Sequence, residues 1–259
     1  MDQSIEHFHE HGWMRVRGGI SQATAAAMRE AVWHLLAESG VKRNRLETWT
    51  AERPSHMQRL KRHAAFAWSP SDGLSEVIAR LLGRSYDPPE HWGAPFIAFP
   101  RDERWSIPAK GWHIDANYRS PLEPPRGVKT LALFGDVAPR AGATLVVAGS
   151  HRLVAKWFAE APPPPEARSA ELRRSLLAHP YIGDLHRPGD ASARIARFLR
   201  REEHEDGLTL YVAELIGRAG DVFVMHPLVM HAAAPNSGAE PRFMVSGGVT
   251  TDLWGWQAE

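Results

Sequence analysis

Residues 112–118, with the sequence WHIDANY, are the stretch on which the interpretation of the whole chain depends. We expect an extended strand here, in which side chains two positions apart point to the same face. His113 and Asp115 would then project side by side. An imidazole and a carboxylate are two of the three ligands of the 2-His-1-carboxylate iron site of non-haem oxygenases. The chain contains 14 histidines, so this triplet needs support from other segments.

A second His-x-Asp triplet, at residues 204–206, is the weaker candidate for a metal site. It lies in the charged run of residues 200–207, RREEHEDG. A charge run that ends at a glycine is typical of a solvated helix end or loop. We therefore favour the triplet that begins at His113.

Composition limits the chemistry that the protein can perform. The chain has 259 residues and is 43% hydrophobic, enough for one large domain. It has no cysteine, which excludes a disulfide framework, an iron–sulfur cluster and a thiol nucleophile. Any metal must be held by histidine or carboxylate, and such ligands favour Fe(II) or Mn(II) over thiolate-bound zinc.

Charge and hydropathy indicate the partners that we expect. The first 15 residues lack the apolar core of a signal peptide, and no apolar run reaches the length of a membrane span. The net charge is +1, and no basic cluster is interleaved with aromatic residues, so nucleic acid is not expected. We expect a cytoplasmic protein with a small-molecule substrate. The sequence does not indicate its oligomeric state.

The order of secondary-structure elements predicts a mainly β chain with flanking helices, in the α+β class. Ser21 is placed to cap a helix over residues 22–39, and Gly83 to end a helix over residues 74–82. Beyond residue 95, short apolar runs separated by glycine and proline turns are typical of a sandwich or barrel. The predicted strands are residues 95–99, 112–118, 129–134, 143–147, 208–216, 222–226 and 243–249.

A helical insertion interrupts the strands. Four consecutive prolines at residues 162–165 break the chain, and helical patterns follow at residues 167–179 and 191–203. Insertions of this kind between barrel strands often form lids or substrate walls, although plain structural packing is an equally good interpretation.

The third metal ligand should come from residues 220–243, where two histidines compete. The turn signal at residues 236–238 predicts a hairpin, and it would place His231 opposite Arg242 with their Cβ atoms about 5 Å apart. His226 lies five positions before His231, so in a regular strand it faces the opposite side. We favour His231 as the ligand and give His226 a structural role. Arg242 can grip a carboxylate in two parallel charge-assisted bonds, as the far carboxylate of a metal-chelating 2-oxo acid would require.

These residues together resemble the phytanoyl-CoA dioxygenase family of Fe(II)- and 2-oxoglutarate-dependent oxygenases. The resemblance covers most of residues 90–250 and, more loosely, the N-terminal helices. The matching segments are residues 8–13, 113–118, 142–152 and 220–242. The resemblance implies a double-stranded β-helix, or jelly roll, with helices packed outside. We expect residues 1–259 to form one domain, with a helical part to about residue 90, a core over residues 91–253 and an insertion over residues 152–207.

The resemblance also implies the roles of the site residues. His113, Asp115 and His231 would bind Fe(II), and Arg242 would bind the distal carboxylate of 2-oxoglutarate. The family usually places a serine where this chain has Ala233, which removes a hydrogen bond to a charged group worth roughly 1.5–3 kcal/mol.

The hydroxyls of Thr130 and Thr144 are the candidates to replace the missing serine hydroxyl. Trp112, Asn117 and Tyr118 are candidate walls of a substrate pocket.

The implied activity consumes O₂ and 2-oxoglutarate, hydroxylates a C–H bond of a small organic metabolite, and releases succinate and CO₂. Related halogenases replace the carboxylate ligand with a small residue, and this chain keeps Asp115, which argues against halogenation. Two alternatives remain open. One is a jelly-roll metal-binding protein without catalytic activity, and the other is a cupin-like metalloenzyme that does not use 2-oxoglutarate.

Overall fold

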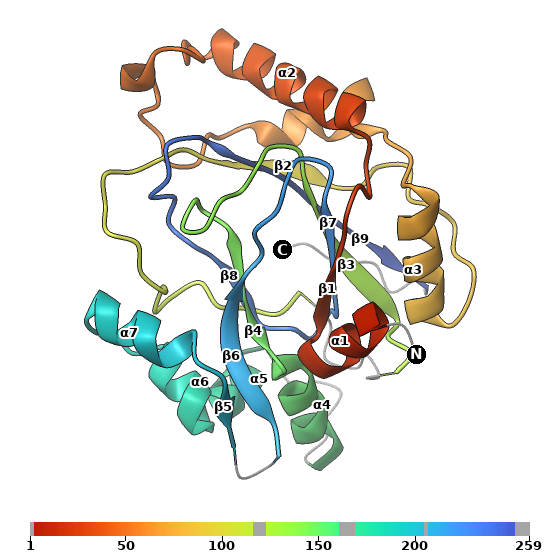
Figure 1. Cartoon of the computed structure of the whole chain (residues 1–259), viewed down its shortest axis with the longest axis vertical. Helices are drawn as coiled ribbons and strands as arrows, with labels where there is room; N and C mark the ends of the chain where they lie inside the picture. The colour runs from red at the N-terminus through yellow and green to blue at the C-terminus, as the bar shows by residue number, and fades with distance from the viewer. Residues whose placement is uncertain (1–2, 116–122, 161–168, 205–206, 252–259) are drawn as a thin grey trace.

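Two antiparallel sheets pack face to face in a jelly roll (Figure 1). The computed structural model describes residues 3–115, 123–160, 169–204 and 207–251. The five-stranded sheet has the order β1 (Trp13–Val16), β7 (Val222–Met225), β3 (Gly127–Leu133), β9 (Arg242–Thr250) and β2 (Ala94–Ala98). The four-stranded sheet has the order β5 (Glu202–Glu203), β6 (Thr209–Glu214), β4 (Thr144–Ala148) and β8 (His231–Ala233).

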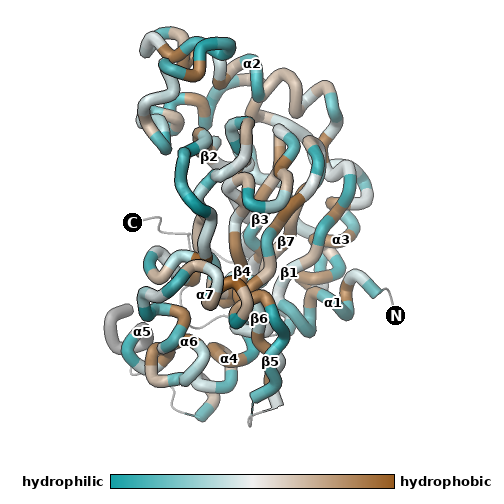
Figure 2. Tube along the Cα trace, turned by 60° about the vertical axis from the view of Figure 1, so that its left-hand side comes forward, coloured by the Kyte–Doolittle hydropathy of each residue, from teal (hydrophilic) through white to brown (hydrophobic). Residues whose placement is uncertain are grey.

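The alternation of side chains along each strand divides the core into an inner and two outer layers. On β3, Leu131 and Leu133 pack between the sheets against Val146 of β4. Val128 and Ala132, which point to the other face of β3, belong to the outer core under the helices. In Figure 2 the hydrophobic segments accordingly gather along β3, β7 and β4 in the middle of the molecule. Both faces of the large sheet are therefore buried.

Three helices pack with the outer face of the five-stranded sheet: α1 (Gln3–His11), α2 (Gln22–Glu38) and α3 (Asp72–Leu82). As predicted, the Ser21 hydroxyl accepts a hydrogen bond from the Thr24 N–H at the start of α2, and α3 ends at Gly83, whose φ is 67°. Between α2 and α3 lie three 3₁₀ turns, η1 (Leu46–Thr48), η2 (Met57–Arg62) and η3 (Ala64–Phe66). No described helix has both the length and the apolar character needed to cross a membrane.

The insertion covers the outer face of the four-stranded sheet. It contains α4 (Ser150–Glu160), α5 (Ser169–Ala178), α6 (Pro180–Leu185) and α7 (Ala191–Phe198). Tyr181 and Leu185 pack against Leu145 and Val147 of β4, so the insertion helices complete a core of their own. The buried guanidinium of Arg194 ties this layer to the loop before the metal site, because it donates to the carbonyl oxygens of Ile107, Pro108, Leu185 and Arg187.

The structure corrects two predictions of local geometry. Residues 112–115 do not form a regular strand, since only His113 makes an isolated β-bridge, with His231. His231 and Arg242 are not cross-strand partners either. His231 lies opposite Val146 in the four-stranded sheet, whereas Arg242 lies opposite Ala98 in the five-stranded sheet. The chain crosses from one sheet to the other between them, so residues 236–238 form a corner of the jelly roll and not a hairpin.

Candidate metal centre

The structure brings His113, Asp115 and His231 together at the open end between the sheets. Each offers a ligand atom, and these atoms all lie within 4.8 Å of one another. The Nε2 atom of His113 is 3.5 Å from Asp115 Oδ1, and that of His231 is 3.5 Å from Asp115 Oδ2. The backbone bridge sets this geometry, because His113 and His231 exchange two N–H···O bonds of 3.0 and 2.9 Å.

The second nitrogen of each imidazole contacts a backbone carbonyl. His113 Nδ1 lies 2.9 Å from the Gly111 oxygen, and His231 Nδ1 lies 3.1 Å from the Val229 oxygen. A carbonyl can only accept, so Nδ1 carries the proton in both rings and the Nε2 lone pairs face Asp115. This arrangement orients metal-binding histidines in other proteins.

The protonation states of the triad suit a divalent cation. Burial lowers the pKa of His231 to about 4, against the opposing effect of Asp115. Burial disfavours the charged form of Asp115, but the neighbouring His231, Lys129 and His113 outweigh it and lower the pKa of the carboxyl. At neutral pH the site therefore presents a neutral His231 beside a carboxylate. Nitrogen and carboxylate donors of this kind fit Fe(II).

Lys129 is a site residue that the sequence analysis missed. Its ammonium forms an ion pair with Oδ2 of Asp115 from the inner face of β3. A charged residue within the mostly apolar run of residues 127–134 was the available signal.

Arg242 is buried inside the jelly roll, and it has no ionic partner among the described residues. Its side chain is 4% exposed, and its Nε atom has no hydrogen-bond partner in the described part of the chain. The Nη1 group donates to the sulfur of Met244, at 3.6 Å. Burial lowers the pKa of Arg242 to about 10. A buried, unpaired guanidinium is unfavourable, so an anionic ligand is the partner that this position fits.

Of the two threonines predicted as hydroxyl donors, one points into the space between the sheets and the other points away from it. Thr144 is cross-strand partner of Ala233, and its hydroxyl contacts the same Met244 sulfur as Arg242, at 3.6 Å. Thr130 alternates with the inward-facing Lys129 and therefore points into the outer core under the helices, so the structure does not bring it to the site.

The predicted pocket walls are only partly placed. Trp112 is buried in the core under the insertion helices, and its indole N–H donates to the Pro108 carbonyl at 2.8 Å. Asn117 and Tyr118 lie outside the described residues. His226 is buried, and its Nδ1 accepts from the Leu228 N–H at 3.1 Å, consistent with a structural role.

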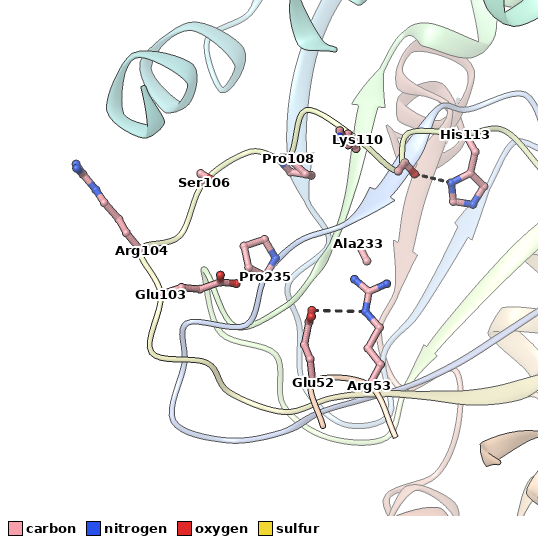
Figure 3. A pocket seen from close by; sticks show the side chains of 11 residues that line it. Glu52, Arg53, Glu103, Arg104, Ser106, Pro108, Lys110, His113, Ala233 and Pro235 are labelled. Carbon is pink, nitrogen blue, oxygen red and sulfur yellow. Dashed lines mark hydrogen bonds and ion pairs between the residues drawn. The ribbon is translucent and has the colours of Figure 1, made fainter. Parts of the chain in front are cut away.

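A cavity of about 410 Å³ opens beside the triad (Figure 3). His113 and Ala233 are among the residues that line it, together with the charged side chains of Glu52, Arg53, Glu103, Arg104 and Lys110. None of these charged residues was singled out in the sequence. Glu52 and Arg53 lie in residues 40–73, which show little pattern.

A jelly roll that encloses a His/Asp/His triad and a buried arginine has the architecture of the Fe(II)- and 2-oxoglutarate-dependent oxygenases. The chain belongs to the phytanoyl-CoA dioxygenase (PhyH) family, whose sequence model matches residues 8–244. The predicted family and fold class are thus confirmed.

Several solved structures share this fold at low sequence identity. AviO1 from Streptomyces viridochromogenes Tue57 is 16% identical, with a TM-score of 0.53 over 97% of this chain and 95% of that one. The non-haem α-ketoglutarate-dependent carbocyclase SnoK from nogalamycin biosynthesis is 15% identical, with a TM-score of 0.52 over 96% and 84% of the chains. EctD from S. alaskensis with bound Fe is 16% identical, with a TM-score of 0.52 over 96% and 76%. No curated protein sequence matches the chain.

Proposed function

We propose that the protein is an Fe(II)- and 2-oxoglutarate-dependent dioxygenase that hydroxylates a C–H bond of a small organic metabolite. The observation that carries the proposal is the buried guanidinium of Arg242. It has no counter-ion in the described part of the chain, and it shares the interior with a His/Asp/His triad. The triad has the ligands to bind a metal ion. The arginine can bind the second carboxylate of a dicarboxylate co-substrate that chelates this metal.

His113, Asp115 and His231 would hold the metal. Bound Fe(II) would supply the activation of O₂ that C–H hydroxylation requires, while 2-oxoglutarate is converted to succinate and CO₂. The backbone carbonyls at Gly111 and Val229 keep both imidazoles in the metal-binding tautomer.

Arg242 would bind the distal carboxylate of 2-oxoglutarate through two parallel hydrogen bonds. Thr144 lies beside Met244, which Arg242 also contacts. The Thr144 hydroxyl is therefore the candidate to replace the serine hydroxyl that is absent at position 233, where this chain has alanine. Leu131, Leu133 and Met244 surround this end of the interior with apolar surface, which would keep water away from the carboxylate.

Phe96 is the best candidate for a contact to the organic part of the substrate. It is 46% exposed, although its strand neighbours are buried. Its cross-strand partner is Met244, so Phe96 projects to the inner side of the large sheet. An exposed aromatic ring on this side fits a substrate with hydrocarbon surface.

We further propose that residues 1–259 act as one catalytic unit. The N-terminal part supplies β1, which pairs with β7 along its whole length and so belongs to the same sheet as Arg242.

The proposed metal site is tested by anaerobic equilibrium dialysis with Fe(II). We expect one iron per chain in the unmodified protein and loss of binding in His231→Ala. His34→Ala removes an exposed histidine on α2 and is the matched control that should bind normally. Equal iron binding by all three proteins would contradict the assignment.

The reaction type is tested with ¹⁸O₂ and candidate metabolites. Hydroxylation predicts one ¹⁸O atom in the product and one in succinate for each turnover. A product that lacks ¹⁸O while succinate forms would instead indicate desaturation, ring closure or epimerisation.

A further inference from the structure

Arg53 is one of three cationic side chains, with Arg104 and Lys110, among the described residues that line the cavity. Figure 3 shows its side chain reaching toward Ala233, whereas Arg104, another cation of the same cavity, extends away from it. Ala233 is the position where the family usually carries a serine, so this guanidinium faces the place where a hydroxyl is missing.

The backbone explains why Arg53 lies there. The Phe99 N–H donates to the Glu52 carbonyl at 2.9 Å, and the Arg101 guanidinium donates to the Thr50 carbonyl at 3.1 Å. Residues 50–53 therefore run along the end of β2. At that end Ala98 is the cross-strand partner of Arg242, so Arg53 starts one strand away from the buried arginine.

The two arginines affect each other electrostatically. After burial, the positive charge of Arg53 is the cause that lowers the pKa of Arg242. Arg53 pairs with the carboxylate of Glu52, at 3.6 Å from Nε, and both side chains are exposed, by 56% and 42%. Such a pair is weak and leaves the guanidinium free to turn to a ligand. Two like charges that act on each other in this way are unfavourable unless an anion binds near both of them.

We propose that Arg53 binds the distal carboxylate of 2-oxoglutarate together with Arg242 and thereby replaces the serine hydroxyl that is absent at Ala233. This inference rests on the proposed function, because it assigns a second ligand to the co-substrate of the same site. The role is one of binding and positioning. It makes the affinity for 2-oxo acids depend on a second, distant carboxylate.

The test measures binding and not turnover. Fe(II)-loaded protein is titrated anaerobically with 2-oxoglutarate and, separately, with pyruvate, a 2-oxo acid without a distal carboxylate. Arg53→Ala should raise the dissociation constant for 2-oxoglutarate by roughly tenfold to a hundredfold, as loss of a hydrogen bond between charged groups does, and leave that for pyruvate unchanged. Arg53→Lys keeps the charge and should lose less.

A rescue variant separates this role from a structural one. In the Arg53→Ala background, Ala233→Ser restores a hydroxyl at the usual family position and should recover part of the lost affinity. Arg104→Ala removes a cation from the same cavity and is the matched control that should bind 2-oxoglutarate normally. The melting temperature of each variant shows whether it is folded.

The outcomes distinguish the two proposals. If the unmodified protein does not bind 2-oxoglutarate, the proposed function fails, and this inference fails with it. If it binds and Arg53→Ala binds equally well, only the role of Arg53 is overturned. An equal loss of 2-oxoglutarate and pyruvate binding in Arg53→Ala also overturns it, because Arg53 would then not recognise the distal carboxylate.

Discussion

Replacement of Arg242 by methionine should stabilise the free protein while removing co-substrate binding. Burial lowers the pKa of this guanidinium from 12.5 to about 10, which corresponds to a cost of roughly 3 kcal/mol for keeping the charge inside the fold. Methionine is a flexible apolar side chain, and its neighbour there is already Met244. We therefore expect Arg242→Met to raise the free energy of unfolding of the metal-free protein by about 1–3 kcal/mol.

The assay is urea unfolding of the metal-free protein, paired with anaerobic 2-oxoglutarate titration of the Fe(II)-loaded protein. Arg242 is charged in both the folded and the unfolded state below about pH 10, so both bind the same number of protons there. The difference in stability between Arg242→Met and the unmodified protein should consequently stay constant from pH 6 to pH 9. Above that range the folded protein loses the proton first, and the cost of the charge disappears as pH rises further.

Arg194→Met is the matched control. Arg194 is equally well buried, at 7% exposure, but its guanidinium donates to four carbonyl oxygens. Its removal leaves buried acceptors unpaired and should destabilise the protein by several kcal/mol. If Arg242→Met destabilises the protein as strongly as Arg194→Met, then Arg242 is held by favourable contacts within the chain. That result would refute the interpretation that Arg242 serves to bind an anionic ligand.

Two further predictions concern threonine side chains and acid stability. Thr144→Val should weaken 2-oxoglutarate binding several-fold, whereas Thr130→Val should leave it unchanged, because only Thr144 points inward; the anaerobic titration measures both, and equal effects would disprove the assigned faces. Burial lowers the pKa of His151 to about 3, so between about pH 6.5 and pH 3 the unfolded chain binds a proton that the folded chain does not. Stability should therefore fall on acidification through this range, and His151→Gln should flatten the dependence in urea unfolding at several pH values; an unchanged slope would show that other groups cause it.

Local signals in the sequence predicted the local structure well. Ser21 and Gly83 define helix ends through hydrogen bonds and backbone angles within a few residues, so they can be recognised without knowledge of the fold. The His113/Asp115 pair is also local in sequence. The five-residue spacing from His226 favours His231 as the ligand, and the structure places the Nε2 atom of His231 beside Asp115.

The strand partners of His231 and Arg242 could not be predicted, because they depend on how the chain crosses between the sheets. An apolar run, a turn and a second apolar run describe a hairpin and a jelly-roll corner equally well, so the pairing of His231 with Arg242 was wrong. The buried side chain of Asn236 holds the corner, since its amide donates to the carbonyl oxygens of Ala98 and Glu240. Which face Thr130 occupies depends on the same long-range pairing.

Arg53 could not have been found from its neighbours in sequence. It follows a 3₁₀ turn in a stretch with no apolar period. The long-range hydrogen bonds from Phe99 to the Glu52 carbonyl and from Arg101 to the Thr50 carbonyl bring it to the end of β2. Functional residues on irregular segments of this kind become visible only when the segments are placed against the strands.

The most direct test of the central claim is anaerobic titration of the Fe(II)-loaded protein with 2-oxoglutarate, followed by the visible charge-transfer absorption of the chelated complex. We expect a band that saturates at one equivalent of 2-oxoglutarate per iron. It should be absent in His231→Ala and should need far higher 2-oxoglutarate concentrations in Arg242→Met. A protein that binds iron but shows no band at any 2-oxoglutarate concentration would contradict the account and favour a metal-binding protein or metalloenzyme that does not use this co-substrate.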